Sequence, residues 1–196
     1  MAPVVILVRH GQTEWTISGQ HTGRTDIPLT DHGREQARAL CGPLAERKLA
    51  LVLSSPLSRA LETCRLAGLG DQVQTDDDLM EWDYGDYEGR TTADIRDGRP
   101  KWSLWLDGAP GGETAAAVGA RVDRVIAEVR EVMAETEADV ALFGHGHGLR
   151  VLAARWLGLT PADGRLFALD PATLSLLGYE RENPVIRRWN DPTGTL

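Results

Sequence analysis

Near the N-terminus the chain reads Val4-Val5-Ile6-Leu7-Val8-Arg9-His10-Gly11-Gln12-Thr13-Glu14-Trp15. The apolar run 4–8, mostly β-branched, predicts a strand that is buried on both faces. The strand ends at Arg9 and His10, and Gly11 is expected to let the backbone turn sharply. Because ligand sites in open α/β sheets form beyond the carboxyl ends of strands, we predict that Arg9 and His10 belong to such a site.

Length and composition indicate the class of protein. The 196 residues contain no linker-like segment, so we expect a single domain over residues 1–196. There is no signal-peptide pattern and no apolar run of bilayer length, and Cys41 and Cys64 lie in helical apolar patterns typical of reduced core thiols. We therefore expect a soluble cytoplasmic protein with no membrane partner.

The formal net charge of -8 argues against a nucleic-acid partner. It does not exclude a small anionic substrate, because arginines gathered in a cleft act locally. The sequence leaves the oligomeric state open, a homodimer included.

Apolar periodicity divides the chain into alternating strands and helices. Strands are predicted at 4–8, 49–53, 72–75, 139–143, 174–179 and 185–189, the last two as an edge hairpin, and helices after Thr30, from 55 to 67, at 92–97, at 115–135 and at 149–156. The segments 12–29 and 76–89 are predicted to be loops. This alternation predicts an α/β fold, a three-layer α/β/α sandwich with a largely parallel central sheet.

Local signals predict where some helices begin and end. Thr30 is a typical N-cap, and Pro43 is expected to kink or end the helix that follows near residues 39–40. Ser55 is expected to cap the helix after the second strand, with the following proline at its first position. Arg59 would then lie in the first turn of that helix, beside the end of the second strand.

Three predicted strands end beside a side chain that can contact an anion: Arg9 with His10, Arg59, and His145. The ends of parallel strands meet at one edge of a sheet, so we expect these side chains to converge. Cleavage of a phosphate monoester needs positive charge around its oxygens, an in-line nucleophile and an acid for the leaving oxygen. Arginines match the oxygens, and a neutral His10 whose tautomer is fixed by a backbone carbonyl is a nucleophile. Glu81 is the candidate acid, since a carboxyl group beside a dianion retains its proton more readily.

The sequence resembles the histidine phosphatase superfamily, the phosphoglycerate mutase-like group, in blocks that follow one another along nearly the whole chain. The blocks are Leu7-Val8-Arg9-His10-Gly11-Gln12-Thr13-Glu14-Trp15, residues 20–30, Ser54-Ser55-Pro56-Leu57-Ser58-Arg59-Ala60, residues 81–89, Pro110-Gly111-Gly112-Glu113 and Gly144-His145-Gly146-His147. The resemblance implies a phosphoglycerate mutase-like fold and phosphorylation of His10. It also implies a phosphate pocket of Arg9, Arg59 and His145, Glu81 as proton donor, and a reaction that needs no metal or other cofactor.

Within that superfamily the chain most resembles the sedoheptulose-bisphosphatase-like and broad-specificity phosphatase branch. The expected substrate is a small phosphorylated metabolite, a sugar phosphate or bisphosphate such as sedoheptulose 1,7-bisphosphate. A phosphoglycerate mutase is the first alternative, but Thr16 stands where mutases usually have asparagine, and a short segment with Trp102 and Trp105 replaces a basic insert. A phospholigand-binding protein without catalysis is the second alternative, and the complete set of catalytic candidates argues against it.

The substrate-binding candidates are Arg9, Thr16, Gln20, His21, Thr22, Gly23, Arg59, Glu81, Tyr84, Gly146 and His147. Candidates for holding a second phosphate are Arg24, Arg90, Arg99 and Lys101. The histidines at 145 and 147 and the two cysteines raise the alternative of a zinc site, but the cysteines lack ligand spacing, so no metal site is predicted. The two tryptophans at 102 and 105 either line the cleft or fill the core.

Overall fold

A computed structural model describes residues 2–192 of the chain. Its sheet has the strand order β3-β2-β4-β1-β5-β6. The strands are β1 Val5–Arg9, β2 Leu49–Ser54, β3 Gln74–Thr75, β4 Asp139–Gly144, β5 Leu174–Glu180 and β6 Asn183–Asp191. β1, β4, β2 and β3 pair in parallel, while β5 and β6 form the antiparallel edge hairpin. The predicted α/β sandwich with a largely parallel sheet is therefore confirmed.

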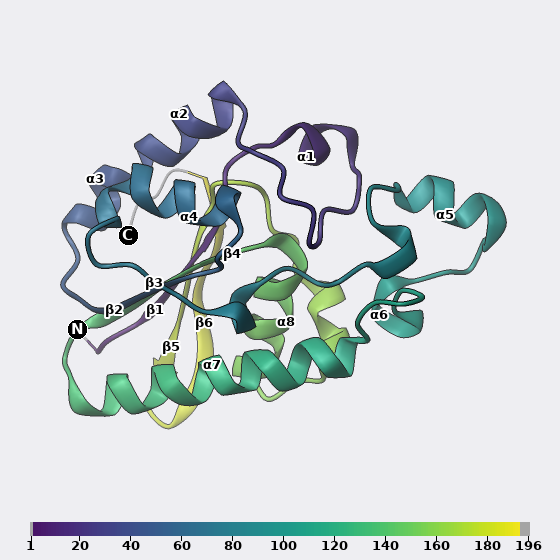
Figure 1. Cartoon of the computed structure of the whole chain (residues 1–196). Coiled ribbons are helices and arrows are strands. Elements are labelled where there is room, and N and C mark those ends of the chain that lie inside the picture. The colour runs from purple at the N-terminus through teal and green to yellow at the C-terminus, as the bar shows by residue number, and fades with distance from the viewer. Residues whose placement is uncertain (1, 193–196) are drawn as a thin grey trace.

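Helices cover both faces of this sheet and the edge where the parallel strands end. They are α1 Glu14–Ser18, α2 Asp31–Ala39, α3 Cys41–Ala45, α4 Ser58–Cys64, α5 Thr92–Gly98, α6 Leu104–Asp107, α7 Ala115–Glu135 and α8 Gly146–Trp156, with shorter helical turns at Arg65–Leu69, Asp77–Leu79, Gly85–Tyr87 and Pro161–Leu166. In Figure 1, α2, α3 and α4 cover one face, α7 and α8 cover the other, and α1, α5 and α6 lie beyond the strand ends.

β1 is the centre of the fold because it contributes to two hydrophobic clusters. Val5 and Leu7 pack into the cluster under α7 and α8, whereas Ile6 and Val8 pack into the cluster under α2–α4. Each of these buried side chains contributes about 1.5–3 kcal/mol through removal from water. The prediction of a strand buried on both faces is confirmed.

The local helix signals were correct in part. The Thr30 hydroxyl accepts a hydrogen bond from the Gly33 backbone N–H, and α2 ends at Ala39, before Pro43, as predicted. The segment 12–29 is not wholly a loop, because Thr13 and Thr16 form a capping box that starts the short helix α1.

Two predictions about single side chains were wrong. Ser55 does not cap α4, because that helix begins at Ser58 and its N-cap residue is Leu57. The Ser55 hydroxyl contacts His145. Cys41 is exposed at the first position of α3 and is therefore not a core thiol. Cys64 is buried as expected, and burial raises the pKa of its thiol to about 12.

Gly11 is required for a different reason from the one predicted. Its backbone is not left-handed, but a Cβ atom at Gly11 would lie 2.4 Å from the carbonyl oxygen of Gly33 in α2. The close approach of two backbone segments, rather than a sharp turn, therefore demands glycine here. No helix within residues 2–192 has both the length and the apolarity to cross a membrane.

Candidate active site

The order β2-β4-β1 brings the three predicted strand ends together. The backbone N–H of His10 donates to the carbonyl of Gly144 at 3.0 Å, and that of Ser55 donates to the carbonyl of Phe143 at 2.9 Å. The rings of His10 and His145 lie with their centroids 5.1 Å apart. The convergence that the sequence predicted at the carboxyl ends of the strands is what the structure shows.

The tautomer of His10 follows from its one short hydrogen bond. Nδ1 lies 2.7 Å from the carbonyl oxygen of Gly11. A carbonyl oxygen only accepts, so Nδ1 carries the proton and Nε2 keeps a free lone pair. Burial, and next the charges of Arg59 and Arg9, lower the pKa of His10 well below its ordinary value. His10 is therefore a neutral imidazole with Nε2 available as a nucleophile.

His145 is oriented by Ser55, a contact between residues 90 positions apart. Its Nε2 lies 2.8 Å from the Ser55 hydroxyl, which accepts the backbone N–H of Leu57. The hydroxyl proton is then free to be donated to Nε2, which leaves the proton of His145 on Nδ1. Burial, and next Arg59 and His10, lower the pKa of His145 well below its ordinary value.

The two predicted arginines donate hydrogen bonds to backbone carbonyls, and Arg59 also forms a long ion pair with Asp26, at 4.0 Å. Arg59, fully buried, donates to the carbonyls of Thr22, Gly23 and Thr25 over 2.9–3.2 Å. Arg9 donates through Nη1 to the carbonyl of Leu169. Burial lowers the pKa of both guanidinium groups, which nonetheless stay positively charged.

Three buried side-chain atoms within residues 2–192 have no hydrogen-bond partner, and they belong to the same three residues. They are Nε of Arg9, Nε of Arg59 and Nδ1 of His145. Leaving a buried donor without a partner costs about 1–3 kcal/mol, so such atoms are rare unless a ligand accepts from them. All three atoms are donors, and an oxyanion is the ligand that satisfies donors only.

Glu81 is held rigidly beside this donor group. Its Oε1 accepts the backbone N–H groups of Trp82 at 2.9 Å and Gly148 at 2.8 Å, and its Oε2 accepts that of His147 at 3.0 Å. Two of these donors lie in the first turn of α8, where a helix favours a negative charge. The carboxyl group is nearly buried, which places it apart from the exposed acidic residues of the same segment.

A cavity of about 180 Å³ opens at this edge of the sheet. It is lined by Arg9, His10, Trp15, Thr16, Gly19, Gln20, His21, Thr22, Glu81, Tyr84, Gly146, His147, Arg150 and Leu169. Most of the predicted site residues are therefore in one place. Arg59, His145 and Gly23 are buried behind the lining, where Gly23 serves Arg59 through its carbonyl.

Several predicted substrate-binding residues use their polar atoms to hold the loop. The Thr16 hydroxyl donates to the Thr13 carbonyl at 2.8 Å, and the Thr22 hydroxyl donates to that of Gln20. The Gln20 amide donates to the carbonyl of Gly89 at 2.7 Å and accepts from Ser18. These three side chains line the cavity but shape it more than they offer free donors.

Arg150 is the functional candidate that sequence reasoning missed. It lies on α8 three residues after His147 and lines the cavity, with its guanidinium 4.6 Å from the ring centre of Trp105. Burial is the main cause that lowers its pKa. The sequence feature that could have identified Arg150 is its spacing of three residues from His147, which places both side chains on the same face of a helix. None of the four sequence candidates for a second phosphate is in the cavity lining.

The two tryptophans of the 101–106 segment lie behind the cavity. Trp102 is buried and donates to the carbonyl of Gly108, while the Trp105 ring lies 5.2 Å from that of His147. Both therefore support the wall of the cleft without being part of its lining.

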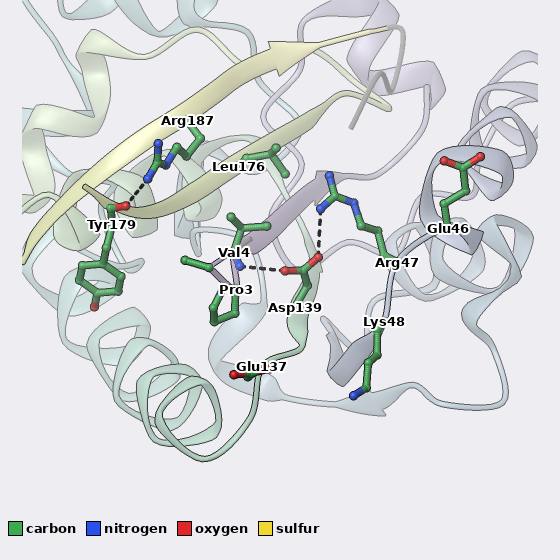
Figure 2. Close-up of a pocket in the computed structure, with 11 residues that line it drawn as sticks. Pro3, Val4, Glu46, Arg47, Lys48, Glu137, Asp139, Leu176, Tyr179 and Arg187 are labelled. Atoms are coloured by element: carbon green, nitrogen blue, oxygen red, sulfur yellow. Dashed lines mark hydrogen bonds and ion pairs between the residues drawn. The ribbon is translucent and has the colours of Figure 1, made fainter. Parts of the chain in front are cut away.

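A larger cavity, of about 490 Å³, lies at the opposite end of the sheet. Figure 2 shows it where β1 and β4 begin, with Val4 and Arg47 both bonded to Asp139. None of the predicted site residues lines it. The volume of a cavity alone therefore does not identify the candidate active site, because the smaller cavity is the one lined by the candidate reactive side chains.

A neutral imidazole beside buried donors for an oxyanion is an arrangement suited to an enzyme that handles phosphoryl groups. The family model for the histidine phosphatase superfamily (branch 1) matches residues 5–192, and the chain belongs to this family. An acid phosphatase of Mycobacterium tuberculosis is 42% identical over 178 residues, covering 90% of this chain and 86% of its own length. A sedoheptulose 1,7-bisphosphatase of Saccharomyces cerevisiae is 37% identical over 187 residues, covering 81% of this chain and 69% of its own.

The fold agrees with this assignment. The solved structure of an open reading frame product of Mycobacterium tuberculosis superposes with a TM-score of 0.93 and 38% identity, over 99% of this chain and 100% of that one. Family and phosphatase relatives together establish that the chain is a phosphatase.

Proposed function

We propose that this phosphatase hydrolyses small phosphorylated metabolites through a phosphohistidine on His10. The observation that carries the proposal is the set of buried nitrogen donors without partners on Arg9, Arg59 and His145. Three donors converging beside the free Nε2 lone pair of a histidine suit a phosphoryl group approached in line.

In the first step, the lone pair of His10 Nε2 attacks phosphorus. The P–O ester bond breaks, its electron pair stays on the leaving oxygen, and Glu81 gives that oxygen a proton. Arg9, Arg59 and Nδ1–H of His145 stabilise the charge on the equatorial oxygens. The free alcohol leaves, and the phosphoryl group remains on His10.

In the second step, the Glu81 carboxylate takes a proton from water while the water oxygen attacks phosphorus. The P–N bond breaks and its electron pair returns to His10 Nε2. Inorganic phosphate is released with Glu81 protonated again. The chain's own side chains supply every charge and proton in this scheme, so we propose a metal-independent reaction.

The cavity supports a substrate with a second anionic group. Arg150 lies in the lining together with Arg9 and His147. A guanidinium there suits a second phosphate or a carboxylate. A sugar bisphosphate such as sedoheptulose 1,7-bisphosphate meets this requirement.

The test is to trap the phosphoryl-enzyme. After brief incubation with ³²P-labelled sugar phosphate and an alkaline quench, which preserves the acid-labile P–N bond of phosphohistidine, label is expected on the wild type and absent from His10→Ala. Turnover of a panel of sugar mono- and bisphosphates should disappear in the same variant and persist in a metal chelator. Labelling that survives His10→Ala would refute the proposal.

Product analysis with the purified wild type distinguishes the phosphatase from the two alternatives, a phosphoglycerate mutase and a phospholigand-binding protein without catalysis. Isomerised 3-phosphoglycerate in place of free phosphate would identify a mutase. Tight phosphate binding with no release from any ester would identify a binding protein.

A further inference from the structure

The hydroxyl of Tyr84 and the ring of His147 form a partly buried hydrogen bond that the steps above do not use. Tyr84 Oη lies 2.7 Å from His147 Nδ1. Tyr84 is almost completely buried, and both residues line the cavity. The direction of this hydrogen bond determines which nitrogen of His147 carries a proton toward the cavity.

The phenol must be the donor. Burial, and next the charge of Glu81, raise the pKa of Tyr84 well above its ordinary value, so the hydroxyl retains its proton. The bond to His147 Nδ1 is the one contact of this hydroxyl that the structure describes. If Nδ1–H donated instead, the phenolic proton would be buried without an acceptor, at about 1–3 kcal/mol.

His147 therefore has its single proton on Nε2. Burial, and next the charge of Arg150, lower the pKa of His147 well below its ordinary value, so the ring is neutral. The rings of His21, Trp82 and Trp105 surround it at centroid distances of 5.2–6.3 Å and restrict its rotation. The side chain is 22% exposed and lines the cavity, where Nε2–H is the ring donor that remains available to a ligand.

His147 lies next to Glu81. The His147 backbone N–H holds Glu81 Oε2, and Nδ1 lies 3.9 Å from the same oxygen. Glu81 is the proposed acid for the leaving oxygen, so the first carbons of the leaving group lie beside His147. A donor there favours an oxygen acceptor on the carbon next to the ester carbon.

We propose that His147 Nε2–H is a specificity-determining donor for phosphate esters whose leaving alcohol carries an oxygen on the neighbouring carbon, and that Tyr84 is a positioning residue that fixes its tautomer. The proposal rests on the proposed function and refines its substrate class. Alkyl phosphates with a hydroxyl on the second carbon and ketose 1-phosphates belong to that class, whereas alkyl phosphates without an oxygen on that carbon do not.

A matched pair of esters tests the specificity. Glycerol 1-phosphate has the neighbouring hydroxyl, and 3-hydroxypropyl phosphate is the same chain with its distal hydroxyl but without the neighbouring one. The ratio of their kcat/KM values is expected to favour glycerol 1-phosphate in the wild type and to fall by about three- to tenfold in His147→Leu, with a smaller fall in Tyr84→Phe. The fall should appear in KM more than in kcat, because the contact exists before the reaction.

The control is Tyr87→Phe, which removes a hydroxyl that contacts Arg99 outside the cavity. It should keep the wild-type ratio. A ratio that is unchanged in both His147→Leu and Tyr84→Phe would overturn the specificity role while leaving the phosphatase mechanism intact. No release of phosphate from either ester by the wild type would refute the proposed function and the specificity role with it.

The tautomer has a readout that does not depend on activity. Long-range ¹H–¹⁵N NMR correlations distinguish a protonated ring nitrogen from a bare one, and the His147 signals are assigned by their loss in His147→Leu. The wild type is expected to show the Nε2–H form alone, and Tyr84→Phe a mixture of both forms. A wild-type Nδ1–H form would overturn the proposal.

Discussion

Arg121 on α7 forms a two-pronged ion pair with Glu113. Its Nε donates to Oε1 at 2.9 Å and its Nη2 donates to Oε2 at 3.1 Å. Burial acts to raise the pKa of Glu113, but the hydrogen bonds and charge of Arg121 outweigh it and hold that pKa below its ordinary value. The Glu113 of the Pro-Gly-Gly-Glu block thus has a structural partner rather than a place in the cavity.

This pair fixes the segment that carries Glu81. The remaining nitrogen of Arg121, Nη1, donates to the carbonyls of Asp78 at 2.7 Å and Met80 at 2.6 Å, and Glu113 Oε2 accepts the backbone N–H of Asp83 at 2.9 Å. The backbone is therefore held on both sides of the proposed acid.

Arg121→Met is expected to lower the free energy of unfolding by about 1–3 kcal/mol, because it leaves the half-buried Glu113 carboxylate without its partner. Turnover should fall as well, since the Glu81 segment loses its support. Urea unfolding and steady-state kinetics measure the two effects. The control is Arg124→Met. Arg124 lies on α7 like Arg121, but its side chain is exposed and pairs with Asp78. This variant should change the free energy of unfolding by no more than about 1 kcal/mol.

Glu81→Gln is expected to slow hydrolysis of alkyl phosphates by about 10²–10⁴-fold. An aryl phosphate should be affected much less, since its leaving oxygen needs little protonation. Asp83→Asn changes the neighbouring carboxylate and should leave the alkyl-to-aryl ratio as in the wild type. Equal losses on both kinds of ester in Glu81→Gln would contradict the acid role.

Stability is expected to fall as the pH drops from 7 to 5. The pKa values of His10, His145 and His147 are all lowered in the folded protein, whereas in the unfolded chain they lie near 6.5. Below about pH 6.5 the unfolded chain therefore binds protons that the folded one does not, and this contribution is complete only above that pH. Each proton adds a slope of about 1.4 kcal/mol per pH unit, so these three rings contribute at most about 4, to which the lowered pKa of His21 adds.

The slope is measured by urea unfolding at several pH values. Removing one of the buried histidines, as in His145→Gln, should reduce the slope by about a quarter to a third. The control is His32→Gln, at an exposed position of α2, which should leave the slope as in the wild type. A stability that is constant between pH 5 and 7 would contradict the neutral state of these rings.

Gly33→Ala is expected to destabilise the protein, although alanine usually stabilises a helix relative to glycine. A Cβ atom at Gly33 would lie 2.2 Å from the carbonyl oxygen of Gln12, so α2 must move away from the loop after His10. Gly98→Ala is the matched control, because a Cβ atom there meets nothing within 4 Å. The control should be neutral or stabilise by up to about 1 kcal/mol, as measured by thermal unfolding.

The sequence by itself determined the sheet, the helix ends at Thr30 and before Pro43, and the convergence of Arg9, His10, Arg59 and His145. These follow from apolar periodicity, local capping chemistry and the rule that parallel strands end at the same edge, all of which are properties of short segments or of topology.

Only the tertiary structure decided which polar groups are free. The Thr16 hydroxyl donates to the carbonyl of Thr13, the N-cap residue of its own helix, and the Ser55 hydroxyl contacts a histidine 90 residues away. Arg150 lines the cavity although it belongs to none of the sequence motifs. A side chain's hydrogen-bonding capacity depends on partners that are distant in sequence and on burial, neither of which a local pattern encodes.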